Sequence, residues 1–451
     1  MSNDALRRQY QAVDWGIGNA AHITRRARRA PGRPSARTLQ WMADLEAVLG
    51  TAPRGRRALL SWPDLQPDGP ESWNRAALDR SVRAVDSLLD DGFHPVVTLL
   101  RHGLPDWLDE AGGWLSRTAA LRFADYAAEL ARRLGDRPIR WVTSADFATS
   151  TVGDHVAGMT SPGRGIGVAG LAAVHHMLLG HGLAIRALRA GGVRTEIGGT
   201  VILYGGYPAT DDPGDRLAVQ RAESLANRLF LDPLLRSRHL VVDGHCPVEA
   251  TGCVRDGDLE VIATPQDAVY LSWHAPLRFT TTEKLPLLMP ATERFRALND
   301  LNRLLAGLGF AVVPFNDVET ATHGWPVLPE ALADAVAGLA TEYGCDLPPV
   351  RIVDNGMSDA GGRSPRHRQT VLAARLRWLA AAMDRGVQVR GYEYWSVLDQ
   401  IDWVAKYAKL YPIAESSRKT KFTALEWDWT RAGSFAPVAA DPAAHQSLRL
   451  V

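Results

Sequence analysis

The chain has little cysteine, no surplus of charge of one sign and no long apolar run. Three cysteines among 451 residues are an odd, sparse set, which excludes a disulfide-stapled scaffold and favours a reducing compartment. Lys and Arg number 51 against 50 Asp and Glu, so the basic surplus that nucleic acid or anionic lipid requires is missing. No stretch reaches the ~18 apolar residues of a membrane span, and residues 1–8 contain no apolar signal-peptide core. We therefore expect a cytoplasmic protein without nucleic-acid or membrane partners.

Short strand-like runs alternate with helix-like patterns along the chain. The strand candidates are 58–62, 94–100, 139–143, 195–203, 267–271, 350–354 and 389–396. Helical spacing of apolar residues marks 81–91, 119–134, 171–189 and 370–384. Such alternation predicts parallel strands with crossover helices, and about eight strand candidates fit a closed (β/α)8 TIM barrel better than an open sheet. We predict an α/β fold with a single domain over residues 1–451 and an irregular insertion around 233–266.

Polar residues follow several of these strand candidates. In a barrel, chemistry takes place where strands end and loops begin. The candidates are Arg101, His102, Asp146, Trp273, His274, Asp354 and the segment 393–403. Taken alone, each aspartate is more often a loop cap or a turn residue. Two carboxylates that face each other at the mouth of one barrel would instead be the arrangement that cleaves glycosidic bonds.

Two groups of metal-ligating residue types were weighed as sites. The run His245-Cys246 with Cys253 fits no familiar zinc spacing and lacks a fourth ligand, so we interpret these cysteines as free thiols in a loop. Three histidines on one helical segment are interpreted as packing or capping residues: His175, His176 and His181. We therefore expect neither a metal nor a cofactor.

A series of ordered segments extends over nearly the whole chain. They are Asp14-Trp15-Gly16, Ser61-Trp62-Pro63, Gln66-Pro67-Asp68-Gly69, Gly112-Gly113-Trp114-Leu115, His175-His176, His181-Gly182, Asn227-Arg228, Phe230 with Leu231-Asp232-Pro233, Trp395-Ser396-Val397-Leu398-Asp399, and Arg418, Lys421 and Ala424-Leu425. Each is weak alone, but their order and spacing together resemble glycoside hydrolase family 1, the retaining β-glucosidases. The resemblance implies a TIM barrel and a small-molecule substrate.

The active-site motifs depart from that family. Its acid/base lies in an Asn-Glu-Pro triplet, where this chain has Ala145-Asp146-Phe147. Its nucleophile lies in a Glu-Asn-Gly triplet, where this chain has Asp354-Asn355-Gly356. A third glutamate, which holds sugar hydroxyls, corresponds to the aspartate of Asp402-Trp403. Because the charge is kept three times while one methylene is lost each time, we interpret the site as resized rather than abandoned.

Other sugar contacts of the family are rewritten or kept. Its His-Trp-Asp is here Arg101-His102-Gly103, and its Asn-Tyr-Tyr is Ser272-Trp273-His274. Arg57 matches an arginine that pairs with the nucleophile. The matching tryptophans of the aglycone and glycone walls are Trp325, Trp395 and Trp403. The resemblance thus implies catalytic roles for Asp146, Asp354, His274 and Arg57, and substrate binding by Arg101, His102, Trp273, Trp325, Trp395, Asp402 and Trp403.

The shortened acids change the expected spacing and protonation. Retaining enzymes hold their carboxyls ~5–5.5 Å apart and inverting enzymes ~6.5–9.5 Å apart. Each lost methylene retracts a carboxyl by up to about 1.5 Å, so a fixed backbone predicts a gap of roughly 7–8 Å with room for water. Asp354 beside Arg57 should stay ionised, whereas burial by Trp141 and Phe147 should raise the pKa of Asp146 and make it the proton donor.

Several alternatives stay open at this point. His274 is either a new general base paired with Asp354 or a neutral donor in the place of a tyrosine. Arg101 either binds an anionic substrate group or neutralises Asp146 and Asp402.

Three functional readings are weighed. The favoured one is an enzyme acting on an atypical glycoside or sugar-like specialised metabolite, by hydrolysis, cyclisation, elimination or isomerisation. The others are an ordinary β-glycosidase and a non-catalytic pseudoglycosidase. The sequence does not decide whether the protein forms a homodimer.

Overall fold

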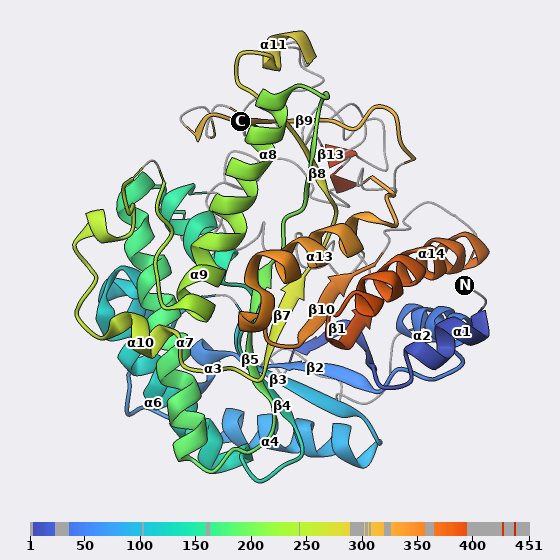
Figure 1. The fold of residues 1–451 in the computed structure, drawn as a ribbon. Coiled ribbons are helices and arrows are strands. Elements are labelled where there is room, and N and C mark those ends of the chain that lie inside the picture. The colour runs from blue at the N-terminus through green and yellow to red at the C-terminus, as the bar shows by residue number, and fades with distance from the viewer. Residues whose placement is uncertain are drawn as a thin grey trace.

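Parallel strands form a closed barrel surrounded by helices (Figure 1). The computed structural model describes residues 3–22, 36–101, 103–158, 163–242, 244–288, 308–319, 326–356 and 365–394, together with 302, 305, 426–427 and 437–438. Around the barrel, the strands follow the order β1-β11-β10-β7-β5-β4-β3-β2. This closed parallel barrel confirms the predicted TIM barrel.

The barrel strands are short and mostly buried. They are β1 (Asp14–His22), β2 (Gly55–Leu59), β3 (His94–Leu100), β4 (Arg140–Ser144), β5 (Ile197–Ile202), β7 (Ala268–Ser272), β10 (Val350–Asn355) and β11 (Val389–Tyr394). Nearly continuous burial, as in β3 and β7, is typical of parallel strands covered on both faces. Apolar side chains of four strands fill the barrel interior: Val96, Val142, Ala268, Tyr270 and Val353.

Helices on the outside of the barrel supply the other wall of the main core. They are α1 (Asn3–Gln9), α2 (Ala36–Leu49), α3 (Trp62–Leu65), α4 (Arg75–Asp90), α5 (Asp106–Glu110), α6 (Arg117–Leu134), α7 (Leu171–Ala190), α9 (Leu229–Arg236), α10 (Asp258–Ile262), α13 (Ala331–Tyr343) and α14 (Pro365–Asp384). Helices α6 and α7 pack together on one side, and α1, α2 and α14 lie on the other (Figure 1). Three predicted helical segments fall within these helices, and the fourth, 81–91, extends one residue beyond the end of α4.

The second strand ends earlier than predicted. The apolar run 58–62 was expected to be a strand, but β2 stops at Leu59 and α3 begins at Trp62. The Ser61 side chain accepts a hydrogen bond from the Asp64 amide at 3.3 Å, and Pro63 lies in the first helical turn. A serine N-cap followed by an early proline starts a helix, which overrides the apolar pattern.

A small sheet was not predicted and extends from two barrel loops. Its strands are β6 (Gly206–Pro208), β8 (Leu277–Thr280) and β9 (Ala311–Val313), and helix α8 (Pro213–Glu223) packs beside them. Since β6 follows β5 and β8 follows β7, the sheet extends from the carboxyl ends of the barrel strands, with α11 (Leu285–Leu288) above it (Figure 1). Strands this short leave too little alternation to be detected in the sequence.

A separate two-stranded sheet pairs β12 (Glu426–Trp427) with β13 (Pro437–Val438).

One described helix is long and apolar enough to cross a membrane by length and composition. It covers Gly167–Ala190, although no such run was expected from the sequence. Within its most apolar window, 78% of the residues are buried inside the fold, and α7 packs against α6. Such burial is typical of a core helix, which explains why the helix is apolar along most of its length.

Close packing of α7 predicts a large effect of one added methyl group. A Cβ at Gly182 would overlap the backbone carbonyl oxygen of Val261 in α10. We expect Gly182→Ala to lower the free energy of unfolding by about 1–3 kcal/mol, as measured by urea denaturation. Gly338 on α13 is the matched control, because a Cβ there meets nothing within 4 Å. Gly338→Ala should be neutral or stabilising by up to about 1 kcal/mol; equal losses in both variants would contradict this packing argument.

Candidate active site

Four predicted catalytic residues meet at the carboxyl end of the barrel. Arg57 lies in β2, Asp146 follows β4, His274 follows β7 and Asp354 is near the end of β10. The Arg57 Nη1 atom lies 3.2 Å from Asp354 Oδ1. The charge of Arg57 lowers the pKa of Asp354, which also interacts electrostatically with His274, and the charge of Asp354 raises the pKa of Asp146. The structure therefore brings all four into one electrostatic unit.

Asp354 is held as an anion. Burial raises its pKa, but the charge of Arg57, together with that of Arg101 and a hydrogen bond from Ser272, outweighs burial, so the pKa lies below its ordinary value. An adjacent guanidinium stabilises the ionised carboxyl in this way. At neutral pH Asp354 is therefore a carboxylate, as a nucleophile or general base must be.

The backbone of Asp354 is strained. Its φ is +53°, a left-handed conformation that residues with a Cβ rarely adopt. The next residue, Asn355, is fully buried and held from three elements. Its Nδ2 donates to the Trp273 carbonyl at 3.2 Å, and its Oδ1 accepts from Arg375 at 3.2 Å and from the Tyr392 hydroxyl. Surroundings that fix the conformation this firmly are what allow strain to persist at a functional site.

Asp146 caps a turn and has a raised pKa. Its Oδ1 accepts hydrogen bonds from the amides of Ala148 at 2.8 Å and Thr149 at 3.2 Å, and its Oδ2 accepts one from the Thr149 hydroxyl. These bonds start a π-helical turn, Thr149–Val156. Burial raises the pKa of Asp146 to about 6, with Asp354 adding to the rise and the hydrogen bonds opposing it. The cap considered in the sequence analysis is present, and the group still holds a proton in weakly acidic solution.

The environment of His274 favours a neutral ring. Burial lowers its pKa, and the charge of Asp354 only partly offsets this. Its Nε2 lies 3.5 Å from the Ser272 hydroxyl. A ring that is neutral at pH 7 favours the role of hydrogen-bonding donor over that of a charged partner of Asp354.

The structure answers less about the substrate-binding residues. Arg101 is half-buried and directly follows β3. Its charge lowers the pKa of Asp354. This favours a neutralising role toward Asp354, whereas Asp146 and Asp402 were the expected partners. Trp273 is 2% exposed, and a Cβ on Gly205 would meet its ring at 2.6 Å. Its ring is therefore closely packed, and a role in substrate binding stays a prediction. Five predicted residues lie outside the described part of the chain: His102, Trp325, Trp395, Asp402 and Trp403.

The three helical histidines named in the sequence analysis lie outside this site. His175 Nε2 lies 2.9 Å from Asp258, His176 Nδ1 lies 3.0 Å from the Trp114 carbonyl oxygen, and His181 Nδ1 lies 2.7 Å from the Thr143 hydroxyl. All three histidines are buried in the core beside the barrel. The cysteines are free thiols. Within the described residues, no group of three His, Cys, Asp or Glu side chains could hold a metal ion.

Two residues near the site received no role from the sequence. Glu393 lies in β11, and its Oε2 is 2.7 Å from the second terminal nitrogen of Arg57. Tyr204 follows β5, and burial together with the charge of Asp146 raises its pKa to about 12. Asn227 holds the Tyr204 backbone by two hydrogen bonds, of 2.9 and 2.8 Å. A charged residue inside a buried strand was the available signal for Glu393; Tyr204 offered none.

Comparisons with known proteins agree with this geometry. The model of glycosyl hydrolase family 1 matches residues 38–422. Thermostable β-glucosidase B of Thermobispora bispora is 33% identical over 380 residues, covering 81% of this chain and 73% of that protein. A bifunctional β-D-glucosidase/β-D-fucosidase of Bifidobacterium breve is 30% identical over 415 residues, covering 86% and 85%. The crystal structure of a psychrophilic β-glucosidase from Micrococcus antarcticus aligns with a TM-score of 0.69 at 27% identity, covering 86% and 88%.

Proposed function

Because the chain belongs to glycosyl hydrolase family 1, we propose that Asp146 and Asp354 divide acid and base chemistry between them on a glycoside or sugar-like compound. The observation that carries the proposal is the opposite protonation of the two carboxyls. Asp146 has its pKa raised to about 6, and Asp354 is kept ionised beside Arg57. Two titratable groups whose environments push their pKa values apart are the mark of an acid and a base.

The two carboxyls are each bonded on their own side of the site. Asp146 is bonded to the amides of its own turn, and Asp354 to Arg57. Both side chains are also one methylene shorter than the glutamates of the family. These features support a gap in the inverting range of ~6.5–9.5 Å, in which a water molecule is activated by Asp354 and attacks the anomeric carbon. Asp354 takes a proton from this water, and Asp146 gives its own proton to the leaving oxygen as the glycosidic bond breaks.

The substrate is proposed to differ from a plain glucoside. Arg101 and His274 stand where the family places uncharged sugar contacts, and both influence the pKa of Asp354. A guanidinium at this place suits a substrate that carries an anionic group or another strong hydrogen-bond acceptor. With a nucleophile inside the substrate, the same acid and base would perform cyclisation, in which Asp354 takes the proton of that nucleophile and Asp146 protonates the leaving oxygen. If Asp354 instead takes a proton from a substrate carbon, elimination follows when Asp146 protonates the leaving oxygen, and isomerisation follows when the proton returns to another atom of the substrate.

Stereochemistry gives the sharpest test. We expect the α anomer to form first from 4-nitrophenyl β-glycosides, because water rather than Asp354 attacks the anomeric carbon. Proton NMR in the first minutes of reaction measures this, on a panel that includes the β-glucoside and β-fucoside. Asp86→Asn is a suitable control variant, because Asp86 lies on α4 and pairs with Arg137, neither of which belongs to the site. It should leave rate and product unchanged.

Other outcomes separate the alternatives. A β anomer formed first, with a fluorosugar attached to Asp354 in mass spectrometry, would contradict inversion and indicate an ordinary retaining β-glycosidase. Absence of turnover on every glycoside, together with a melting temperature that rises with one of them, would indicate a non-catalytic binding protein.

A further inference from the structure

One guanidinium serves two buried carboxylates. Arg57 Nη2 lies 2.7 Å from Glu393 Oε2, and Arg57 Nη1 lies 3.2 Å from Asp354 Oδ1. The side chains are only 6% exposed for Arg57, 9% for Glu393 and 16% for Asp354. Water therefore screens these charges weakly, and each carboxylate responds to what the other does with the shared cation.

The first barrel strand leaves space for this arrangement. Gly16 of β1 pairs with Glu393 on one side and with Gly55 of β2 on the other. A Cβ on Gly16 would lie 3.1 Å from Glu393 Cγ and 3.1 Å from Gly55 Cα. Because neither glycine has a side chain, the Glu393 side chain can cross β1 inside the barrel and reach Arg57 on β2. The local sequence is thus suited to this long-range contact.

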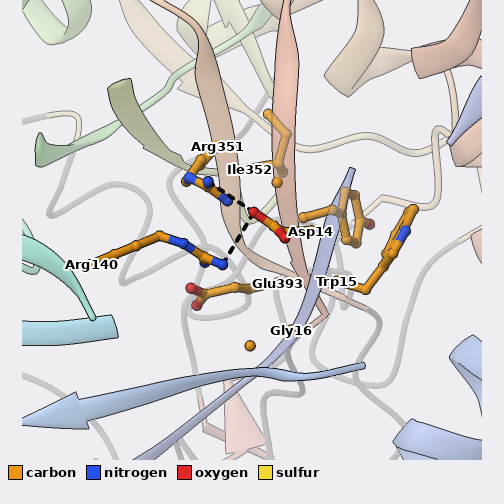
Figure 2. Close-up of a pocket in the computed structure, with 10 residues that line it drawn as sticks. Asp14, Trp15, Gly16, Arg140, Arg351, Ile352 and Glu393 are labelled. Atoms are coloured by element: carbon orange, nitrogen blue, oxygen red, sulfur yellow. Dashed lines mark hydrogen bonds and ion pairs between the residues drawn. The ribbon is translucent and has the colours of Figure 1, made fainter. Parts of the chain in front are cut away.

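Other charges near Glu393 are already paired. Glu393 lines a small pocket with Asp14, Arg140 and Arg351, with room for about one water molecule and too small for a sugar (Figure 2). Arg140 and Arg351 both contact Asp14, at 3.1 and 3.0 Å (Figure 2). Arg351 also binds Glu196 at 2.5 and 2.8 Å. The bond that the structure gives Glu393 is therefore the one to Arg57.

We propose that Glu393 is a positioning residue that holds Arg57 and offsets part of its charge, which keeps Asp354 more basic than Arg57 alone would leave it. The inference rests on the proposed role of Asp354 as base or nucleophile. A cation lowers the pKa of a neighbouring carboxyl, and a second anion on the same cation raises it again. Other groups that act on Asp354 include Asp146, His274, Arg101 and Ser272. Replacement of Glu393 removes none of these side chains.

Titration of Asp354 separates this role from a merely structural one. Protein labelled with 13C at the aspartate carboxyl is followed by NMR from about pH 2.5 to 7, and the Asp354 signal is assigned by its absence in Asp354→Asn. We expect Glu393→Gln to lower the midpoint of Asp354 by about one unit. Glu393→Asp, which keeps the charge on a shorter side chain, should give a smaller shift in the same direction.

Controls make the result decisive. Glu196→Gln removes another barrel carboxylate bound to an arginine, but one bonded to Arg351 rather than Arg57, and it should leave the Asp354 midpoint unchanged. Circular dichroism at each pH verifies that every variant is folded. If Glu393→Gln does not fold, the smaller downward shift of Glu393→Asp carries the test. An unchanged midpoint in the folded Glu393 variants overturns the inference.

The titration needs no turnover, so it is independent of the proposed function. Loss of the proposed function would appear as full activity of Asp354→Asn, whatever Glu393 does to the midpoint. Where turnover is measured, Glu393→Gln should lower kcat about tenfold with little change in KM, since a weaker base acts in the transition state rather than in substrate binding. A variant that raises KM with kcat unchanged would argue against a role in tuning Asp354.

Discussion

Replacement of Asp354 by asparagine is expected to lower kcat/KM on an aryl β-glycoside by about 10⁴-fold. The substitution keeps the shape of the side chain and removes the negative charge that activates water or attacks the substrate. It also leaves Arg57 with Glu393 as its partner, at 2.7 Å, so the buried guanidinium is not left without a counter-ion. A loss of folding therefore cannot account for the loss of activity. Steady-state kinetics with a matched thermal melt measures both.

The backbone of Asp354 makes a paired comparison possible. At φ +53° a glycine is unstrained, whereas alanine is strained by about 1–2 kcal/mol. Asp354→Gly and Asp354→Ala should therefore be equally inactive, while the glycine variant is the more stable in urea denaturation. Residual activity within tenfold of the unchanged protein in both variants would contradict a role for Asp354 in the chemistry.

Most of the barrel was predictable because strands such as β3 and β7 are buried almost continuously. An apolar run such as 94–100 can be recognised without knowledge of its neighbours, and β3 has these bounds. The three-residue strands β6 and β9 lack such a run and depend on contacts with β8 that are distant in the sequence. Trp62 shows the same limit, since the cap at Ser61 and not the apolar pattern decides its structure.

The site was predictable where a residue type carries its chemistry alone. Asp146 and Asp354 follow strands, and strand ends in a barrel converge. Glu393 was a candidate only as the first residue of the segment 393–403 and received no role, because its role depends on Gly16 and Gly55, which leave the space it crosses. That relation joins three strands and cannot be read from any one of them. The close packing of Trp273 was not predictable for a related reason, because it depends on the space beside Gly205.

Replacement of Asp146 by asparagine should lower kcat/KM by about 10²–10⁴-fold for glycosides with poor leaving groups, since a general acid contributes this much. For dinitrophenyl glycosides, which need no proton, the loss should be small. The pH dependence has a defined sign. Burial raises the pKa of Asp146 to about 6, so the proton donor is present below that pH and is lost above it. The rate on poor leaving groups should therefore fall as pH rises through about 6, and Asp146→Asn should abolish that fall.

A second carboxyl with a raised pKa offers a control for the fall of activity above about pH 6. Asp154, in the same π-helical turn, also has its pKa raised to about 6 by burial. Its Oδ1 accepts hydrogen bonds from the amides of Gly163 and Arg164, at 2.7 and 3.2 Å, so it holds a neighbouring loop rather than a substrate. Asp154→Asn should consequently keep the fall of activity above about pH 6, even if its rate is lower throughout. If the fall of activity above about pH 6 disappears in Asp154→Asn and persists in Asp146→Asn, Asp146 is not the proton donor. Only replacement of the group that gives its proton to the leaving oxygen can remove both this fall and its restriction to poor leaving groups.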